Sequence, residues 1–219
     1  MIKRFQIRDA LIGPISSVRT PFHQDGRIDF DGLRQAIDFN IKAGSKTILL
    51  TAGDSHYFAL SDDEIAEVTR VTTKHTNGRA IVVAADRHYN TNQAIEFARF
   101  CTQVGADVLM LLPPDWEQSC TPETLAVHYT QVAQHIPVMI VTQVFTPRGG
   151  AFGLETLRLT LSRGENVVAV KDDMCDSFGR KMGILVHNRW AVISGGAEAK
   201  PHERSSLRMQ RLSFGFHHF

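Results

Sequence analysis

The sequence is poor in cysteine: it has three, at positions 101, 120 and 175, and none of them forms a CxxC pair. An odd number of widely spaced cysteines supports neither a disulfide framework nor a zinc site, so we expect no structural disulfide and no metal. The chain also lacks an excess of either charge, with 24 basic and 23 acidic residues. This balance excludes the basic footprint of a nucleic-acid-binding protein and an acidic tail, so we expect no nucleic-acid partner.

Long apolar runs are absent as well. No segment reaches the ~20 consecutive apolar residues that cross a bilayer, so we expect no membrane partner. The first residues, MIKRFQIRDALIG, begin with basic side chains but contain neither a long apolar run nor a small-residue cleavage site. The default expectation is therefore a cytoplasmic protein.

What the sequence does contain is a regular alternation of short apolar runs and longer amphipathic segments. We predict seven strands, within residues 11–18, 46–53, 79–86, 107–114, 137–144, 166–171 and 190–196. Six helices are predicted between them, within residues 29–44, 60–75, 90–105, 121–135, 154–163 and 177–187. Ser61 with Glu64 has the spacing of a capping box, and Thr121 followed by proline is typical of a helix start.

Nearly continuous apolar strands separated by helices indicate a parallel sheet with both faces covered. A doubly wound sheet and a (β/α)₈ barrel both fit this pattern, but no GxGxxG motif follows the first strand, which disfavours the nucleotide-binding version. We therefore expect an α/β fold, a TIM barrel spanning residues 1–196. The pattern stops after Gly196, so we expect the barrel to be incomplete after the seventh strand and residues 197–219 to form an irregular, out-of-frame tail.

The stretch NVVAVKDDMCD at residues 166–176 places Lys171 at the end of an apolar strand. In a parallel α/β fold, reactive groups collect at the carboxyl ends of the strands, and Lys171 is the one lysine at any of these predicted ends. One reading is a strand reaching solvent, which position alone favours. The other is an amine among apolar residues, which loses its charge more readily and can form a Schiff base with a ketone or aldehyde.

Several motifs in a fixed order resemble the family of dihydrodipicolinate synthase and N-acetylneuraminate lyase. The matching stretches along residues 11–196 are GPISSVRTPFHQDGRIDFDGL, TAGDSHYFALSDDEIAEV, GADVLMLLPP, AVKDD and WAVISGG. Each motif alone is unremarkable, but their joint order is fairly specific. The resemblance implies a (β/α)₈ barrel and makes Lys171 the Schiff-base lysine.

The resemblance also assigns a place for the substrate carboxylate. The stretch TAGDS, with Thr51, Ala52 and Gly53, is similar to the family loop that holds the carboxylate of a 2-oxo acid. Ala52 stands where the family has a second threonine, so one hydroxyl contact is missing. Backbone N–H groups in a glycine-containing turn can still bind an anion. Arg148 lies loosely near an arginine that some members use for a second carboxylate.

The chain departs from the family at its proton-transfer residues. Thr142 stands where the family has the tyrosine that acts as general acid/base, which makes it the candidate catalytic partner of Lys171. A threonine hydroxyl is far less acidic than a phenol of pKa ~10, so it cannot replace that tyrosine unaided. The fourth strand is followed by PDW in place of tyrosines. We expect Asp172 and Asp173 to cap the next helix.

The main hypothesis is a lyase or aldolase that forms a lysine Schiff base with pyruvate or another 2-oxo acid and needs no cofactor. A full-length barrel of this kind is expected to form a homo-oligomer. Two alternatives stay open: a non-catalytic barrel that binds a 2-oxo acid, and an inactive fragment of such an enzyme.

Overall fold

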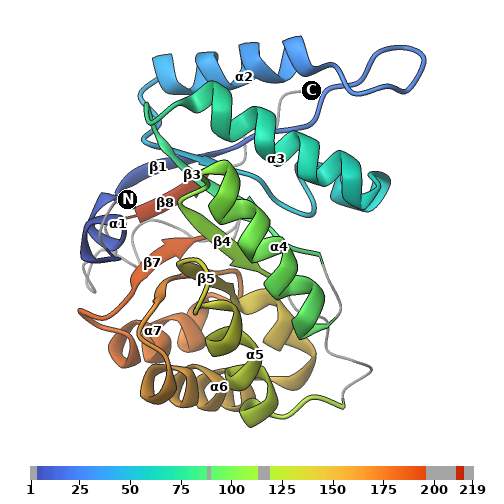
Figure 1. The fold of residues 1–219 in the computed structure, drawn as a ribbon. Helices are drawn as coiled ribbons and strands as arrows, with labels where there is room; N and C mark the ends of the chain where they lie inside the picture. Colours follow the sequence, from blue (N-terminus) through green and yellow to red (C-terminus); the bar gives the residue numbers. More distant parts are fainter. Residues whose placement is uncertain (1–3, 88–89, 113–118, 196–210, 215–219) are drawn as a thin grey trace.

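The strands form a closed barrel in which every neighbouring pair is parallel (Figure 1). The computed structural model describes residues 4–87, 90–112, 119–195 and 211–214. The strands are β1 (Gly13–Ser17), β2 (Thr47–Leu49), β3 (Ile81–Ala85), β4 (Val108–Leu111), β5 (Val138–Val141), β6 (Val167–Asp172), β7 (Ala191–Ser194) and β8 (Arg211–Phe214). Each strand pairs with the next one in chain order, and β8 pairs with β1.

The helices lie outside the strands, in a layer that runs from α2 at the top of Figure 1 to α6 and α7 at the bottom. They are α2 (Phe30–Lys42), α3 (Asp62–Thr76), α4 (Thr91–Val104), α5 (Pro122–Val132), α6 (Gly150–Arg163) and α7 (Asp176–Leu185). Each packs against the next in chain order. The residues of β2, β3, β4 and β5 are all buried, which explains why these strands read as continuous apolar runs rather than as alternating ones.

Local signals in the sequence set several helix ends. The capping box of α3 is confirmed, since Ser61 Oγ accepts the Glu64 N–H at 3.2 Å and the Glu64 carboxylate accepts the Ser61 N–H at 2.8 Å. Thr121 caps α5 in the predicted way, with proline at the first helical position. Gly105 ends α4 with a φ of 87°, a left-handed conformation that glycine adopts without strain. These three ends follow from the residues themselves.

The first helix, α1 (Arg4–Ala10), was not predicted. It precedes β1 and contacts β6. Its Ile7 and the following Leu11 are buried in the hydrophobic core, and the Arg8 guanidinium donates to the carbonyl of Asn188 just before β7. Since these contacts lie at the ends where β1 and β7 begin, α1 covers the amino-terminal end of the barrel. The opposite end, where the strands finish, is the end at which active sites of this fold lie.

The expectation that residues 197–219 form no strand is wrong at residues 211–214. There β8 pairs with β1 from Gly13–Arg211 to Ser16–Phe214, and it meets β7 at Ser194 and Leu212. In Figure 1 the red β8 lies beside the blue β1. The TIM-barrel class is thus confirmed, and the expected gap after the seventh strand is filled by β8. Residues 196–210 and 215–219 lie outside the described part, so the predicted boundary at residue 197 stays a prediction.

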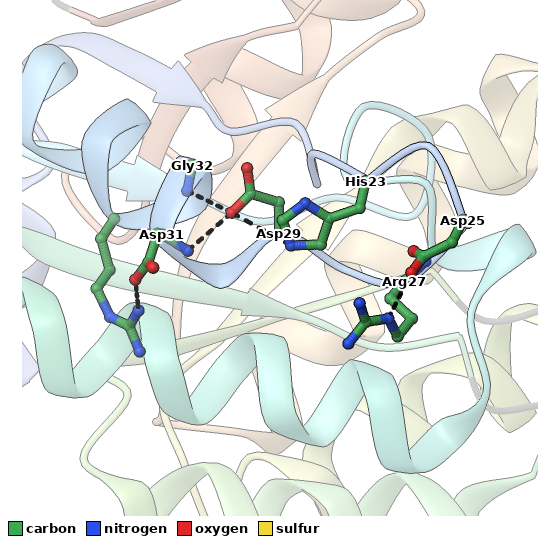
Figure 2. Close-up of polar contacts among 7 residues, drawn as sticks. His23, Asp25, Arg27, Asp29, Asp31 and Gly32 are labelled. Atoms are coloured by element: carbon green, nitrogen blue, oxygen red, sulfur yellow. Dashed lines mark hydrogen bonds and ion pairs between the residues drawn. The ribbon is translucent and has the colours of Figure 1, made fainter.

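The loop after β1 is held by contacts among residues close together in the chain, several of which Figure 2 shows. Residues Phe22 and Ile28 form an antiparallel bridge, and within it the Arg27 guanidinium lies 2.8 Å from Asp25 and lowers the pKa of that carboxyl. Asp29 then caps α2 by accepting the N–H of Gly32 at 2.9 Å. These groups are mostly exposed and bonded to near neighbours in the chain. We therefore assign this loop a structural role.

Within the described residues, no helix is both long enough and apolar enough to span a membrane.

Candidate functional site

Lys171 lies near the carboxyl end of β6, opposite Ile193 of β7 in the strand register. Its side chain is 17% exposed, and its Nζ lies 2.5 Å from Oδ1 of Asp173, whose side chain is 13% exposed. Asp173 is the first residue after β6, and the contact between the two side chains places them on the same side of the chain. The lysine is therefore a largely buried, paired amine, and the reading of a solvated strand end does not fit it.

Asp172 faces the other way, toward the helical layer. Its Oδ1 accepts the N–H groups of Met174 at 3.2 Å and Cys175 at 3.0 Å. A methyl group on Gly179 of α7 would lie 2.5 Å from Oδ2 of Asp172, which places this carboxylate directly against the helix. Asp172 thus anchors the segment that leads into α7, close to the capping role expected for it. Asp173 differs from that expectation, because its carboxylate binds Lys171 instead.

Gly195, which follows β7, lies directly beside this ion pair. A Cβ built on it would lie 2.1 Å from Oδ1 of Asp173 and 2.5 Å from Nζ of Lys171. The Gly195 N–H donates to the Asp172 carbonyl at 2.9 Å, which continues the pairing of β6 with β7. The absence of a side chain at residue 195 is what gives the lysine and the aspartate their space.

Thr142 is completely buried, at the start of the short helix η3 (Thr142–Arg148) that follows β5. Its Oγ1 accepts the N–H of Asp173 at 2.9 Å and makes a long contact of 3.4 Å with Oδ1 of Asp172. The hydroxyl therefore holds the backbone of the residue that pairs with Lys171. Sequence reasoning placed Thr142 beside Lys171, and the structure brings the two together through Asp173. A catalytic role for the hydroxyl itself stays a prediction.

The TAGDS turn follows β2, at the same end of the barrel as Lys171. Thr51 Oγ1 accepts the Asp54 N–H at 2.8 Å, and the Thr51 N–H donates to Ser55 Oγ at 3.0 Å. A hydroxyl that accepts one hydrogen bond can still donate its own proton. In the described part of the chain, the N–H groups of Ala52 and Gly53 donate no hydrogen bond. The turn thus presents one hydroxyl and two backbone donors to an anion.

Arg148 is held by other contacts at the far end of η3. Its Nη1 donates to the Cys120 carbonyl at 3.1 Å, and its guanidinium carbon lies 4.4 Å from the centre of the Phe152 ring. These contacts bind it to the start of α5 and to α6. They support a structural role as much as substrate binding, so the sequence-based assignment stays a prediction.

The described residues contain no group of three or more histidine, cysteine, aspartate or glutamate side chains arranged to hold a metal ion. The groups that could do chemistry at this end are instead an amine, a carboxylate and a set of anion donors. The PDW segment after β4, at residues 114–116, lies outside the described residues.

A second buried polar pair lies away from Lys171, between α4 and α5. His128 is 1% exposed, and its Nδ1 lies 3.0 Å from Oγ1 of Thr91. Burial lowers the pKa of His128, and the charge of Asp86 partly opposes this shift. The fold therefore favours the neutral imidazole.

Asp173 is the site residue that sequence reasoning missed. It was read as a helix cap because it precedes α7. The available signal was its spacing: residues two apart in extended chain share a face, and residue 173 comes two positions after Lys171, directly after the end of β6.

The chain is similar to a known protein family and to curated proteins of that family. The dihydrodipicolinate synthetase family matches residues 10–212. A 4-hydroxy-tetrahydrodipicolinate synthase from Ruthia magnifica subsp. Calyptogena magnifica is 31% identical over 168 residues, which are 76% of this chain and 56% of that protein. One from Methylibium petroleiphilum is 29% identical over 162 residues, or 55% of its length. The chain thus spans about half the length of these curated relatives.

Solved structures agree on the fold. Dihydrodipicolinate synthase from Aquifex aeolicus superposes with a TM-score of 0.78 at 23% identity, covering 93% of this chain and 69% of that one. N-acetylneuraminate lyase from Mycoplasma synoviae superposes with a TM-score of 0.76 at 18% identity, covering 94% and 69%. The resemblance drawn from the sequence motifs is confirmed.

Proposed function

The chain belongs to the dihydrodipicolinate synthetase family, and from this premise we propose that it is a lyase whose Lys171 forms an imine with a 2-oxo acid such as pyruvate. One observation carries the proposal. Lys171 is a largely buried amine at the carboxyl end of β6, inside a closed barrel, paired with a carboxylate. Active sites of this fold lie at that end of the strands.

Imine formation would give the chain its chemistry without a cofactor. The amine attacks the keto carbon, water leaves, and the protonated imine withdraws electrons from the neighbouring carbon. That carbon can then lose a proton, or a bond to a second carbon, and the electrons are held by the imine. A carbon–carbon lyase or aldolase reaction follows from this one intermediate.

The carboxylate of the 2-oxo acid would lie against the TAGDS turn. The Thr51 hydroxyl and the N–H groups of Ala52 and Gly53 are the donors proposed for it, in keeping with their availability in the fold. We assign Arg148 at most to a second carboxylate of a larger substrate, because its present contacts are with Cys120 and Phe152. A homo-oligomer and a cytoplasmic location are further predictions from the sequence.

Borohydride trapping tests the proposal. The chain is mixed with pyruvate, and separately with larger 2-oxo acids, reduced with borohydride and digested, and the modified peptide is identified by mass spectrometry. We expect one reduced adduct on the peptide that contains Lys171. K171R should abolish it, and K181R, which changes an exposed lysine on α7, should not. No adduct with any 2-oxo acid, or equal trapping by K171R, would refute the proposal.

A second function, binding of a 2-oxo acid without turnover, is favoured by the environment of Thr142. Its hydroxyl accepts the N–H of Asp173 and directs its own proton toward Oδ1 of Asp172, and no phenol takes its place in the sequence. Isothermal titration with pyruvate separates the two functions. Binding without a trapped adduct supports the binding barrel, whereas an adduct supports the lyase.

A further inference from the structure

We propose that Asp173 is the acid/base group that serves Lys171, in the place left by the family tyrosine; this inference rests on the proposed function. No motif in the sequence assigns Asp173 such a role. The proposal comes from the geometry around the Lys171 amine: among the residues that the structure describes, the Asp173 carboxylate contacts the reacting nitrogen, and no tyrosine is seen to do so.

Three contacts hold the Asp173 carboxylate at the amine. Its backbone N–H is bound by Thr142 Oγ1 at 2.9 Å, and its Oδ1 lies 2.5 Å from Nζ of Lys171. Gly195 lies against both groups, so a single methyl there would overlap them. Proton transfer requires heavy atoms within hydrogen-bond reach, up to about 3.2 Å, and the 2.5 Å between Nζ and Oδ1 is well inside that limit.

The environment of the second carboxylate oxygen of Asp173 also supports an acid/base role. Oδ2 of Asp173 is buried and has no hydrogen-bond partner among the residues that the structure describes. Buried polar atoms are nearly always bonded, and an exception calls for an explanation such as a catalytic role or a bound molecule. An oxygen that is shielded from solvent and unbonded is suited to receive a hydroxyl group of a bound intermediate.

A purely structural ion pair is the competing interpretation. Removing two charges from water is costly, and a buried ion pair is often no more stabilising than apolar residues of the same volume. The pair joins Lys171 to a residue only two positions further along the chain, just past the end of β6, so it ties no distant parts of the fold together. A contribution to stability therefore explains this arrangement poorly, whereas proton transfer between Asp173 and Lys171 explains it.

The proposed step balances as follows. Asp173 takes a proton from the Lys171 ammonium, and the neutral amine attacks the keto carbon, whose π electrons move to oxygen. One proton passes from nitrogen to that oxygen and gives the carbinolamine. The protonated Asp173 then donates its proton to the hydroxyl, the C–O bond breaks, water leaves, and the nitrogen lone pair completes the C=N bond. Asp173 ends as a carboxylate beside a protonated imine.

Thr142 acts here as a positioning residue, since it holds the Asp173 backbone. In the part of the chain that the structure describes, the charged groups beside Asp173 are Lys171, which it contacts, and Asp172, whose carboxylate is turned toward α7. Gly195, which follows β7, and Thr142 of η3 bring no charge. The pH dependence of imine formation should therefore report the Lys171–Asp173 pair.

The test measures the rate of borohydride-trapped adduct with pyruvate across pH. We expect D173N to lower the rate by roughly 100-fold, the lower end for general acid/base catalysis, and to flatten its pH profile. D176N is the matched control: it removes the same charge from the exposed first turn of α7. Asn is suited to the φ of 48° at residue 176, so D176N should trap at the rate of the unchanged chain.

A second variant distinguishes the loss of the carboxylate from a loss of folding. D173A should trap slowly, and added formate should restore part of the rate, because a free carboxylate can enter the vacated space. A rate for D173N equal to that of the unchanged chain, with the same pH profile, overturns the proposal, and so does a D173A rate that formate leaves unchanged. Either result leaves the proposed function intact, whereas no adduct in the unchanged chain refutes the proposed function itself.

Discussion

Substitution of Gly195 by alanine tests the geometry of the site without removing any of its reactive groups. The new Cβ would lie 2.1 Å from the Asp173 carboxylate and 2.5 Å from the Lys171 amine. The φ of Gly195 is not in the left-handed region, so the backbone accepts alanine. The strain falls on the ends of two side chains, and those ends have to move.

The required displacement sets the size of the effect. Ordinary contacts to a Cβ begin near 3.4 Å, so the amine and the carboxylate must each shift by roughly 1 Å. A misplacement of about 1 Å at a reacting centre can cost 100-fold in rate, which corresponds to about 2.7 kcal/mol in the barrier. The stability of the fold should change little, because Lys171 and Asp173 can turn away together.

The assay is the initial rate of borohydride-trapped adduct with pyruvate, with thermal unfolding measured in parallel. G183A is the matched control, since residue 183 lies in α7 and a Cβ there has nothing within 4 Å. We expect G195A to trap about 100-fold more slowly and to melt near the unchanged chain. A G195A protein that traps at the unchanged rate would show that the position of the pair does not matter and would refute the reasoning.

Three further predictions concern other parts of the chain. T51V should weaken pyruvate binding by roughly tenfold or more in isothermal titration, since a hydrogen bond to a charged group is worth about 1.5–3 kcal/mol; unchanged affinity would place the carboxylate elsewhere. S61A should lower the free energy of unfolding by about 1 kcal/mol in urea denaturation, because it removes the cap of α3; no change would mean that the cap is not used. Burial lowers the pKa of His128, so its contribution to stability is present above the unfolded pKa of ~6.5 and is lost as pH falls through the folded pKa. H128N should therefore lose less stability than the unchanged chain when pH falls from about 7.5 to about 5.5, and equal losses would contradict this assignment.

The strands and helices that the sequence predicted are those with strong local signals. The core strands β2 to β7 are apolar, and α3 and α5 begin at residues whose side chains bind their own first turn. By contrast β8, with the sequence RLSF, has no apolar run. It is a strand because β1 on one side and β7 on the other offer it backbone partners. A strand that depends on its neighbours in space leaves no pattern of its own.

The candidate site likewise has parts that could be predicted from the sequence and parts that could not. Lys171 and the TAGDS turn were predicted because the resemblance carries them by position along the chain. The pairing of Lys171 with Asp173 depends on the directions of their side chains at the end of β6. From the order of residues alone, Asp173 was expected to cap the next helix. The role of Gly195 needs the approach of β7 to β6, a contact between segments more than twenty residues apart, and no local rule supplies it.

A crystal structure of the chain after reaction with pyruvate and borohydride tests the central claim most directly. We expect continuous density from the Lys171 amine to the former keto carbon. The pyruvate carboxylate should be bound by Thr51 and the N–H groups of Ala52 and Gly53, and the Asp173 carboxylate should lie beside the new C–N bond. An adduct on another lysine, or a carboxylate bound away from the TAGDS turn, would contradict the account.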